Sequence, residues 1–371
     1  MRRALCLLLA LVCLLLCGCA AVPAAPVVTR PVGEMPLAYA ENFGVVYYEG
    51  GAAVLTVAGQ TQFLLLPEGA EIPAGLETLP VLHTPLRQVY LASSSAADLF
   101  LQAGALEAVR YTSTLAADWR LPELRDAVDG ERILFAGKYS APDYELLLTE
   151  GCDFVVENTM ILHNPAAKEK LEALGLPVMI EYSSYEPHPL GRVEWVKLYG
   201  LLTGHMEEAE AFFDSQLKLF QSVESMEKTG KTAAFFHITA NGAVVVRRQA
   251  DYTTRMIELA GGETALTDLP ESENALSTVT IQMESFYRQA RDADVLIYNS
   301  TVTGDVESID ELLALSPLLK DFKAVREGNV WCTEQSMFQK SSAAAGMIAD
   351  FRAVFTGTAE DGELSFLHKI S

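Results

Sequence analysis

The chain has 371 residues, which is enough for two modest domains or one large one, and half of them are apolar, which allows a sizeable core. Its 27 basic and 49 acidic residues give a formal net charge of −22. A surface this acidic argues against nucleic acid and against anionic lipid headgroups as partners, because both are themselves anionic.

The N-terminus has the pattern of a secretory signal peptide. Arg2 and Arg3 precede an uncharged apolar run from Ala4 to Leu16. This run is shorter, by roughly five residues, than a comfortable transmembrane helix. We expect residues 1–18 to be removed on export, which makes the mature domain extracytoplasmic, at the cell surface or in the periplasm.

The run Leu16-Cys17-Gly18-Cys19 resembles a bacterial lipobox, which implies that Cys19 is lipidated and begins the mature chain. Residues 19–36 are rich in Ala, Pro and Val and predict a flexible tether between this lipid and the fold. The lipid anchor would hold the domain at the membrane through its buried acyl chains. The alternative is an ordinary signal peptide whose cysteines are incidental.

Only Cys152 and Cys332 remain once the signal peptide and Cys19 are set aside. Two cysteines are too few for a disulfide framework or a cysteine-based zinc site, so we expect buried free thiols and leave a single disulfide open. His163, His188 and His237 do not show the spacing of metal ligands. The sequence therefore predicts neither a protein metal site nor a cofactor.

Between Phe43 and Leu66, short β-rich runs are separated by Gly50-Gly51, which predicts a small antiparallel element at the front of the first lobe. Strand and helix patterns then alternate from Val89 to Tyr182, and the helices end at glycines such as Gly104. This alternation predicts an N-terminal α/β lobe with a largely parallel sheet over residues 37–188.

Residues 189–228 change to a helical pattern. Trp195, Leu198 and Leu202 form an apolar stripe at spacings of three and four, and the pattern breaks near Gly204. We expect a stiff helical spine here. Strand–helix alternation resumes after Lys228, so residues 229–371 are predicted to form a second α/β lobe.

Four segments follow one another in a characteristic order. They are Ser93-Ser94-Ser95 with the helix after it, Ala141 to Val156, Tyr185 to Trp195, and Glu258 to Glu263. Together they resemble the metal-chelate type of ABC-transporter substrate-binding proteins, which serve ferric siderophores, haem and cobalamin. The resemblance covers roughly residues 43–355.

Two strand entries depart from this family. Its usual Pro-Asp-Leu-Val reads Cys152-Asp153-Phe154-Val155 in the first lobe and Ala293-Asp294-Val295-Leu296 in the second. Both replacements keep the character of a strand, so the expected fold is unchanged. They do, however, make the sequence less similar to any one member of the family.

The resemblance implies an α/β fold with two Rossmann-like lobes joined by a long interlobe helix, which is the class III periplasmic-binding-protein type. It implies that the protein is a monomer that binds its ligand and does not catalyse a reaction. The ligand would be a metal chelate, such as an iron siderophore, captured between the two lobes. The partner would be the permease of an ABC importer, and any metal would arrive inside its chelator. A stiff spine would leave the cleft largely preformed, with a small hinge movement on binding.

The family also implies candidate docking residues. One glutamate on each lobe contacts arginines of the permease, and the matching residues are Glu145 and Glu284. Charged contacts of this kind mainly set the rate and register of an encounter. The alternative is that both are ordinary solvated helix residues.

Ligand-binding residues are expected at the carboxyl ends of the strands, where α/β sheets bind ligands. The candidates are Ser94, Tyr139, Asn158 and Tyr185 in the first lobe and Arg247, Arg248 and Tyr252 in the second. Tyrosine offers an apolar face with a polar tip, and arginine offers a planar fork for anionic chelates. Adjacent strand residues point to opposite faces, so we expect one of the two arginines to meet the ligand.

Three alternatives remain open. The ligand could be cobalamin or haem instead of an iron siderophore. A metal-chelatase-like enzyme on a two-lobed α/β fold would need metal-binding side chains grouped in the cleft, and the sequence shows no such grouping. A surface-scaffold lipoprotein would need no cleft at all.

Overall fold

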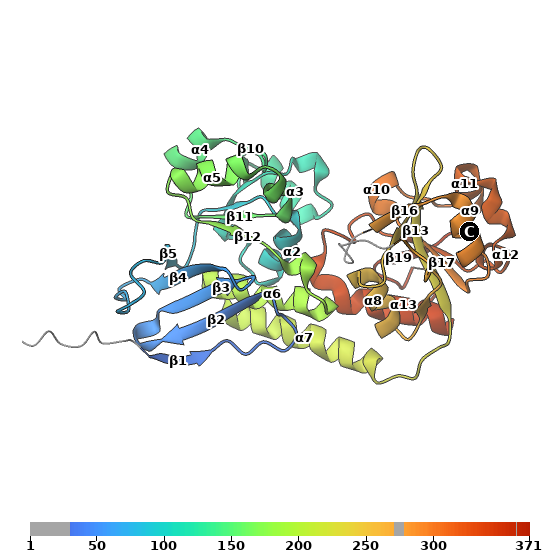
Figure 1. The fold of residues 1–371 in the computed structure, drawn as a ribbon, viewed down its shortest axis with the longest axis horizontal. Coiled ribbons are helices and arrows are strands. Elements are labelled where there is room, and N and C mark those ends of the chain that lie inside the picture. Colours follow the sequence, from blue (N-terminus) through green and yellow to red (C-terminus); the bar gives the residue numbers. More distant parts are fainter. Residues whose placement is uncertain (1–29, 271–277, 361) are drawn as a thin grey trace, which may run out of the picture.

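The computed structural model describes residues 30–270, 278–360 and 362–371, and Figure 1 shows two lobes side by side with helices beneath them. The predicted signal peptide, Cys19 and residues 19–29 of the predicted tether lie outside the described residues. None of the helices within these described ranges is both long and apolar enough to cross a bilayer.

A five-stranded sheet begins the described chain. Its strands, in spatial order, are β1 (Pro31–Glu34), β2 (Phe43–Tyr48), β3 (Ala53–Val57), β4 (Thr61–Pro67) and β5 (Val81–Thr84). Pairing is antiparallel from β1 to β4, as the hairpin pattern predicted, and β5 adds in parallel beside β4. The tether was predicted too long, because residues 31–34 form β1 and Met35 is buried in the core.

The N-terminal lobe is built on a second, entirely parallel sheet. Its strand order is β12 (Val178–Ile180), β11 (Phe154–Glu157), β6 (Val89–Leu91), β7 (Val109–Thr112) and β8 (Leu134–Phe135). The strands alternate with α2 (Ser94–Gln102), α3 (Pro122–Asp129), α4 (Tyr144–Thr149) and α5 (Pro165–Ala173), and β9 (Gly137–Lys138) pairs with β10 (Ala141–Pro142).

Alternate residues of the inner strand β11 explain the layering of this lobe. In β11, Phe154 and Val156 point to the core shared with α2 and α3, whereas Val155 points to the core under α4 and α5. Both faces of the sheet are therefore covered, as parallel sheets require.

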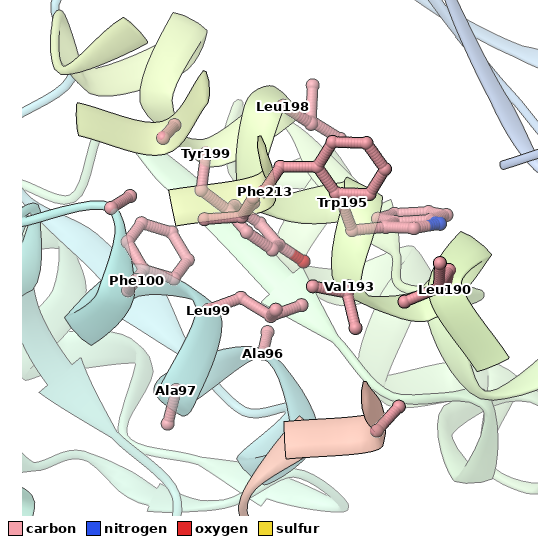
Figure 2. Close-up of a cluster of buried hydrophobic side chains, with 14 of the residues drawn as sticks. Ala96, Ala97, Leu99, Phe100, Leu190, Val193, Trp195, Leu198, Tyr199 and Phe213 are labelled. Carbon is pink, nitrogen blue, oxygen red and sulfur yellow. The ribbon is translucent and has the colours of Figure 1, made fainter. Parts of the chain in front are cut away.

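The interlobe segment consists of two helices, α6 (Pro189–Thr203) and α7 (Met206–Glu224), and the break falls where it was predicted, at left-handed Gly204. The two helices pack closely, because a Cβ on Gly200 would lie 2.5 Å from the Cβ of Ala209. Figure 2 shows α6 side chains, among them Trp195 and Tyr199, packed with Phe100 of α2 and Phe213 of α7. At about 1.5 Å per residue, α7 spans roughly 28 Å, and it packs against both α2 and α13.

The C-terminal lobe contains a mixed sheet. Its main strand order is β16 (Thr278–Ile281), β14 (Val244–Arg247), β13 (Thr232–Ile238), β17 (Val295–Tyr298), β18 (Val330–Thr333) and β19 (Leu367–Lys369), and β15 (Glu263–Thr264) also pairs with β13. The inner strands β13, β17 and β18 are parallel.

Helices cover both faces of this sheet as well. They are α8 (Tyr252–Leu259), α9 (Met283–Ala290), α10 (Ser300–Thr303), α11 (Ile309–Leu315), α12 (Lys323–Arg326) and α13 (Ala344–Thr356). Side chains of α8 and α13 belong to the same buried cluster as α2, α6 and α7, so one core runs from lobe to lobe. The predicted fold, two α/β lobes with a helical connection, is confirmed.

Two buried carboxylates, of Glu186 and Glu194, bind the backbone of residues 38–42 near the first turn of α6. Glu194 of α6 accepts hydrogen bonds from the backbone N–H groups of residues 38–40 and from the Lys197 ammonium. Glu186 accepts from the next two N–H groups, at residues 41 and 42, and from the Trp195 indole. Five successive amides are thus satisfied by side chains, which fixes the entry of the chain into the fold.

Candidate binding site

The loops at the carboxyl ends of the strands bring the two lobes together. The loop of residues 334–343 follows β18 and ends in the 3₁₀ turn η7 (Ser341–Ala343). From this loop, Gln339 accepts a hydrogen bond from the Arg120 N–H at 2.7 Å and donates one to the Asp118 carbonyl at 2.9 Å. Because Asp118 and Arg120 follow the carboxyl end of β7, the strand ends of the two sheets face a common region.

A second connection joins the same loop to α2. The buried Asp98 carboxylate accepts hydrogen bonds from the backbone N–H of Ser342 at 2.9 Å and from its hydroxyl at 2.6 Å. Hydrogen bonds to a charged acceptor are stronger than those between neutral groups. Together, the Gln339 and Asp98 contacts form what we call the interlobe latch.

The chain order of the N-terminal sheet marks its binding edge. From β6 the chain moves to β7 and β8 on one side, and later to β11 and β12 on the other. Open α/β sheets bind ligands outside the carboxyl ends of the strands at such a reversal. Asn158 lies in the loop after β11, and Ser94 is the first residue of α2, which follows β6, so both predicted residues lie at this edge.

Polar side chains line this edge. The Glu181 carboxylate, almost fully buried, accepts hydrogen bonds from the hydroxyls of Ser93 and Ser95 and from the Ser183 N–H, at 2.9 to 3.2 Å. The Ser183 hydroxyl is also buried and has no hydrogen-bond partner within the described part of the chain. A buried hydroxyl without a partner is costly, so this group is suited to a ligand.

The other predicted residues of the N-terminal lobe differ in how freely their side chains could contact a ligand. Tyr185 is 39% exposed and stands edge-on to Tyr182, with ring centroids 5.9 Å apart. Asn158 is engaged in structure: its amide donates to the Ala92 carbonyl and its oxygen accepts from the Met160 N–H. Tyr139 lies in the β9–β10 hairpin and packs on the core beneath α4 and α5.

In the C-terminal lobe, the two predicted arginines have protein partners. Arg247 pairs with Asp251 at 3.3 Å, and its guanidinium lies 4.6 Å from the ring centre of Phe338. Arg248 donates to the Pro270 carbonyl. Arg247 is the last residue of β14 and Arg248 lies just beyond it, and the charge of Arg247 is already compensated by Asp251.

Tyr252 begins α8 and faces the interlobe helix α6. Its ring centre lies 4.0 Å from the guanidinium carbon of Arg192, a residue that the sequence reasoning did not select. The signal that could have identified Arg192 is a cation in the first turn of a helix, where the helix dipole disfavours positive charge.

Arg192 and Tyr252 line a small cavity at the junction of the lobes. Lys340 and Ser341 also line it, together with Ala344 and three methionines, Met256, Met337 and Met347, and its inner surface is apolar. Its volume is about 10 Å³, enough for one water-sized group. A larger groove of about 510 Å³ lies on the other side of the same loop, between α2, α7 and α13.

Cysteine and histidine side chains of the described residues serve packing and capping. No cluster of three His, Cys, Asp or Glu side chains among them could hold a metal ion. Cys152 and Cys332 are free, as expected, and burial raises the pKa of each thiol to about 11. His188 instead caps α6, and burial lowers its pKa to about 4.

The two predicted docking residues occupy equivalent places in the two lobes. Glu145 and Glu284 are each exposed and each is the second residue of a helix, α4 and α9. Those helices lie far apart along the long axis of the molecule, one on each lobe (Figure 1).

No protein-family model matches the chain. Two uncharacterized lipoproteins of Methanocaldococcus jannaschii are similar to it. One is 24% identical over 92% of this chain and 89% of its own length, and the other is 22% identical over 82% of this chain and 77% of its own.

Three solved structures share the fold. A periplasmic haem-binding protein of Vibrio cholerae aligns with 73% of this chain and 98% of its own, at 14% identity and a TM-score of 0.58. A protein of an ABC-type Fe³⁺-hydroxamate transport system from Saccharomonospora viridis aligns with 74% and 94%, at 16% identity and 0.53. A periplasmic vitamin B12-binding protein of Vibrio cholerae aligns with 73% and 97%, at 14% identity and 0.51. The two-lobed fold implied by the resemblance is thereby confirmed.

Proposed function

We propose that this protein is an extracytoplasmic, lipid-anchored binding protein that captures one metal chelate between its lobes and delivers it to an ABC importer. The observation that carries the proposal is that strand carboxyl ends of the parallel N-terminal sheet meet those of the mixed C-terminal sheet, with unpaired polar groups on both sides. Structures of the same fold bind haem, vitamin B12 or belong to iron-hydroxamate transport. We propose an iron-siderophore-type chelate, with haem or cobalamin as the second candidate.

The chemical groups of such a chelate match the side chains at the junction of the lobes. Its bulky apolar rim suits the half-buried Tyr182 and the exposed Tyr185, and its polar groups suit Ser183 and Tyr252. An enzyme such as a metal chelatase would need grouped metal ligands, and the described residues contain none. The geometry therefore favours capture of an intact chelate.

The ligand is tested with purified mature protein and three chromophores: a ferric siderophore, haem and cobalamin. Excess chelate is removed by gel filtration, and the absorbance of the protein peak identifies what is retained. We expect one class to be retained at about one per chain, and Tyr185→Ala to weaken its binding by about tenfold. Retention of none of the three would contradict the proposal.

Docking through Glu145 and Glu284 is tested by the double charge reversal Glu145→Lys, Glu284→Lys. Chelate uptake by the host cells should fall about tenfold or more, while the Kd for the chelate stays unchanged. The control is Glu169→Lys, which reverses an exposed acid on α5. Equal uptake by the double variant and the control would rule the two glutamates out.

The membrane anchor is tested at Cys19. Cells expressing the protein are supplied with labelled palmitate, and the purified protein is examined for the label. We expect incorporation in the wild type and none in Cys19→Ser. Label that persists in the variant would place the lipid elsewhere.

A further inference from the structure

Exposed apolar side chains lie along one edge of the N-terminal lobe. Leu115 follows β7, Phe135 ends β8, Met160 and Leu162 follow β11, and Tyr185 follows β12. All five residues are 38% to 54% exposed. The remaining exposed large apolar residues of the described ranges are spread over the rest of the fold. Single exposed apolar residues are ordinary, whereas a set gathered at one place marks a binding surface.

The strand order puts these five residues, which we call the apolar row, next to one another. The sheet runs β12-β11-β6-β7-β8 and is parallel, so all its carboxyl ends lie at the same edge. At about 4.8 Å between neighbouring strands, the row extends over roughly 19 Å. Its middle, after β6, is polar, because the hydroxyls of Ser93 and Ser95 bond to the Glu181 carboxylate there. The row is therefore long enough for a bulky ligand and has a hydroxyl-rich centre.

The apolar row borders the junction with the other lobe. The loop that carries Leu115 also provides the contacts to Gln339. Across the junction, Val302 of α10 is 63% exposed and follows the carboxyl end of β17. The Ser300 N–H, in the same helix, donates to the Thr333 hydroxyl at the end of β18, where the loop to Gln339 starts. Figure 1 shows α10 on the side of its lobe that faces the N-terminal lobe, so apolar side chains stand on both sides of the junction.

The place of the row favours the ligand as its occupant over the permease or the membrane. The two glutamates proposed for docking lie on α4 and α9, outside these loops. A net charge of −22 disfavours contact with an anionic membrane surface. By contrast, the row lies at the edge where α/β sheets bind ligands, next to the loop whose Ser183 hydroxyl lacks a partner among the described residues.

We infer that the bound chelate carries a large apolar part, an acyl chain or an aromatic ring system, which lies along the apolar row. The inference rests on the proposed function and narrows its ligand class to chelates with such a part. A compact hydrophilic chelate would leave the row in water, whereas an apolar part removes both surfaces from water and binds more tightly in proportion to the area buried. The polar groups of the chelate would meet the serines at the centre of the row.

The first test compares two chelates that differ only in an apolar chain. They are the ferric complexes of N-acetyl-desferrioxamine B and N-dodecanoyl-desferrioxamine B, which hold iron through the same three hydroxamates and are both uncharged. We expect the wild type to bind the dodecanoyl complex at least tenfold more tightly, because each buried methylene contributes about fourfold in affinity. Haem serves as a further probe, with an aromatic ring system as its apolar part.

The second test removes apolar surface from the row itself. The double variant Met160→Ser, Leu162→Ser changes exposed side chains, so the core stays intact, and it should bind the dodecanoyl complex or haem about tenfold or more weakly. The matched control is Leu219→Ser, Met226→Ser, which removes the same two residue types, also exposed, from α7 and the turn after it. The control should keep the affinity of the wild type.

Each outcome decides the inference. Equal affinity for the two acyl derivatives, or equal affinity of the double variant and the control for the probe that binds, would overturn it and leave the proposed function in place. If the double variant keeps its Kd but supports less uptake by cells, the row contacts the permease and the inference is wrong. Retention of cobalamin or of an unmodified ferric siderophore, but of none of these probes, would overturn only the inference, and retention of no chelate at all would overturn both.

Discussion

Among single residues, the buried acids show how burial and hydrogen bonding compete. Glu194 and Glu181 are buried yet surrounded by donors. Glu157, at the end of β11, is fully buried, and neither of its oxygens has a hydrogen-bond partner in the described structure. Burial raises the pKa of Glu157 to about 8, so the folded protein holds this carboxyl in its neutral form near neutral pH.

This difference predicts a pH dependence of stability. In the unfolded chain Glu157 loses its proton near pH 4.5, whereas in the folded chain it keeps the proton to about pH 8. The free energy of unfolding should therefore fall as the pH rises through that window. The side chain of Glu157→Gln is neutral at every pH. At pH 8 the free energy of unfolding of this variant should therefore be about 1–3 kcal/mol higher than that of the wild type.

The measurement is urea unfolding at pH 5 and pH 8. Glu169→Gln, an exposed acid on the neighbouring helix α5, serves as the control and should follow the wild type at both values. A gain for Glu157→Gln that is equal at pH 5 and pH 8 would contradict the assignment.

Residue chemistry was only partly predictable. Arg247 and Arg248 stood out because adjacent arginines suit an anionic ligand, but Asp251, four residues along, already neutralises Arg247. The position of Arg192 in the first turn of a helix could be read from the sequence, but the lack of a hydrogen-bond partner for its Nε depends on how the chain packs. Tyr185 follows β12 and Tyr252 begins α8, and contact of either residue with a ligand stays a prediction.

Among the elements, the interlobe latch is the feature that couples the lobes. Asp98 of α2 holds the backbone and the side chain of Ser342, which lies 244 residues along the chain. Because the contact is buried and charged, we expect a double-mutant cycle of Asp98→Ala and Ser342→Ala to give a coupling free energy of about 1–3 kcal/mol.

Unfolding of the four proteins of the cycle in urea supplies this coupling energy. A parallel cycle with Ser336→Ala, in the same loop but with its hydroxyl unbound to Asp98, should give a coupling energy near zero. If the coupling free energy of the Asp98–Ser342 cycle is no larger than that of this control, the latch does not link the lobes energetically.

Element boundaries show where sequence patterns stop being sufficient. The glycines at 104 and 204 marked helix ends correctly, because a left-handed residue is needed there. Strands β1 and β5 were missed, since each is short and is defined by pairing with a neighbour rather than by its own pattern. The helical spine was recognised as one segment, but its folding into a packed pair depends on the contact of Gly200 with Ala209.

For the whole molecule, a single buried core joins the lobes through α2, α6, α7 and α13. Such packing resists large domain movements, in contrast to lobes joined by strands alone. We expect the radius of gyration, measured by small-angle X-ray scattering, to change by no more than roughly 1 Å when the chelate binds. A compaction of several ångströms would show that the latch and the helical pair do not hold the lobes.

The fold class followed from the order of elements alone, because alternating strands and helices leave few arrangements. The ligand did not, because it depends on which polar groups remain unpaired after folding. Proteins that share a fold often bind different ligands, because the ligand depends on the residues of the site and not on the scaffold.

The most direct test of capture between the lobes is hydrogen–deuterium exchange with and without the chelate that the protein retains. We predict slower exchange on both sides of the junction at once: residues 93–95 and 182–185 of the N-terminal lobe, and residues 252–256 and 337–343 of the C-terminal lobe. Protection confined to one lobe, or found at neither, would contradict the account.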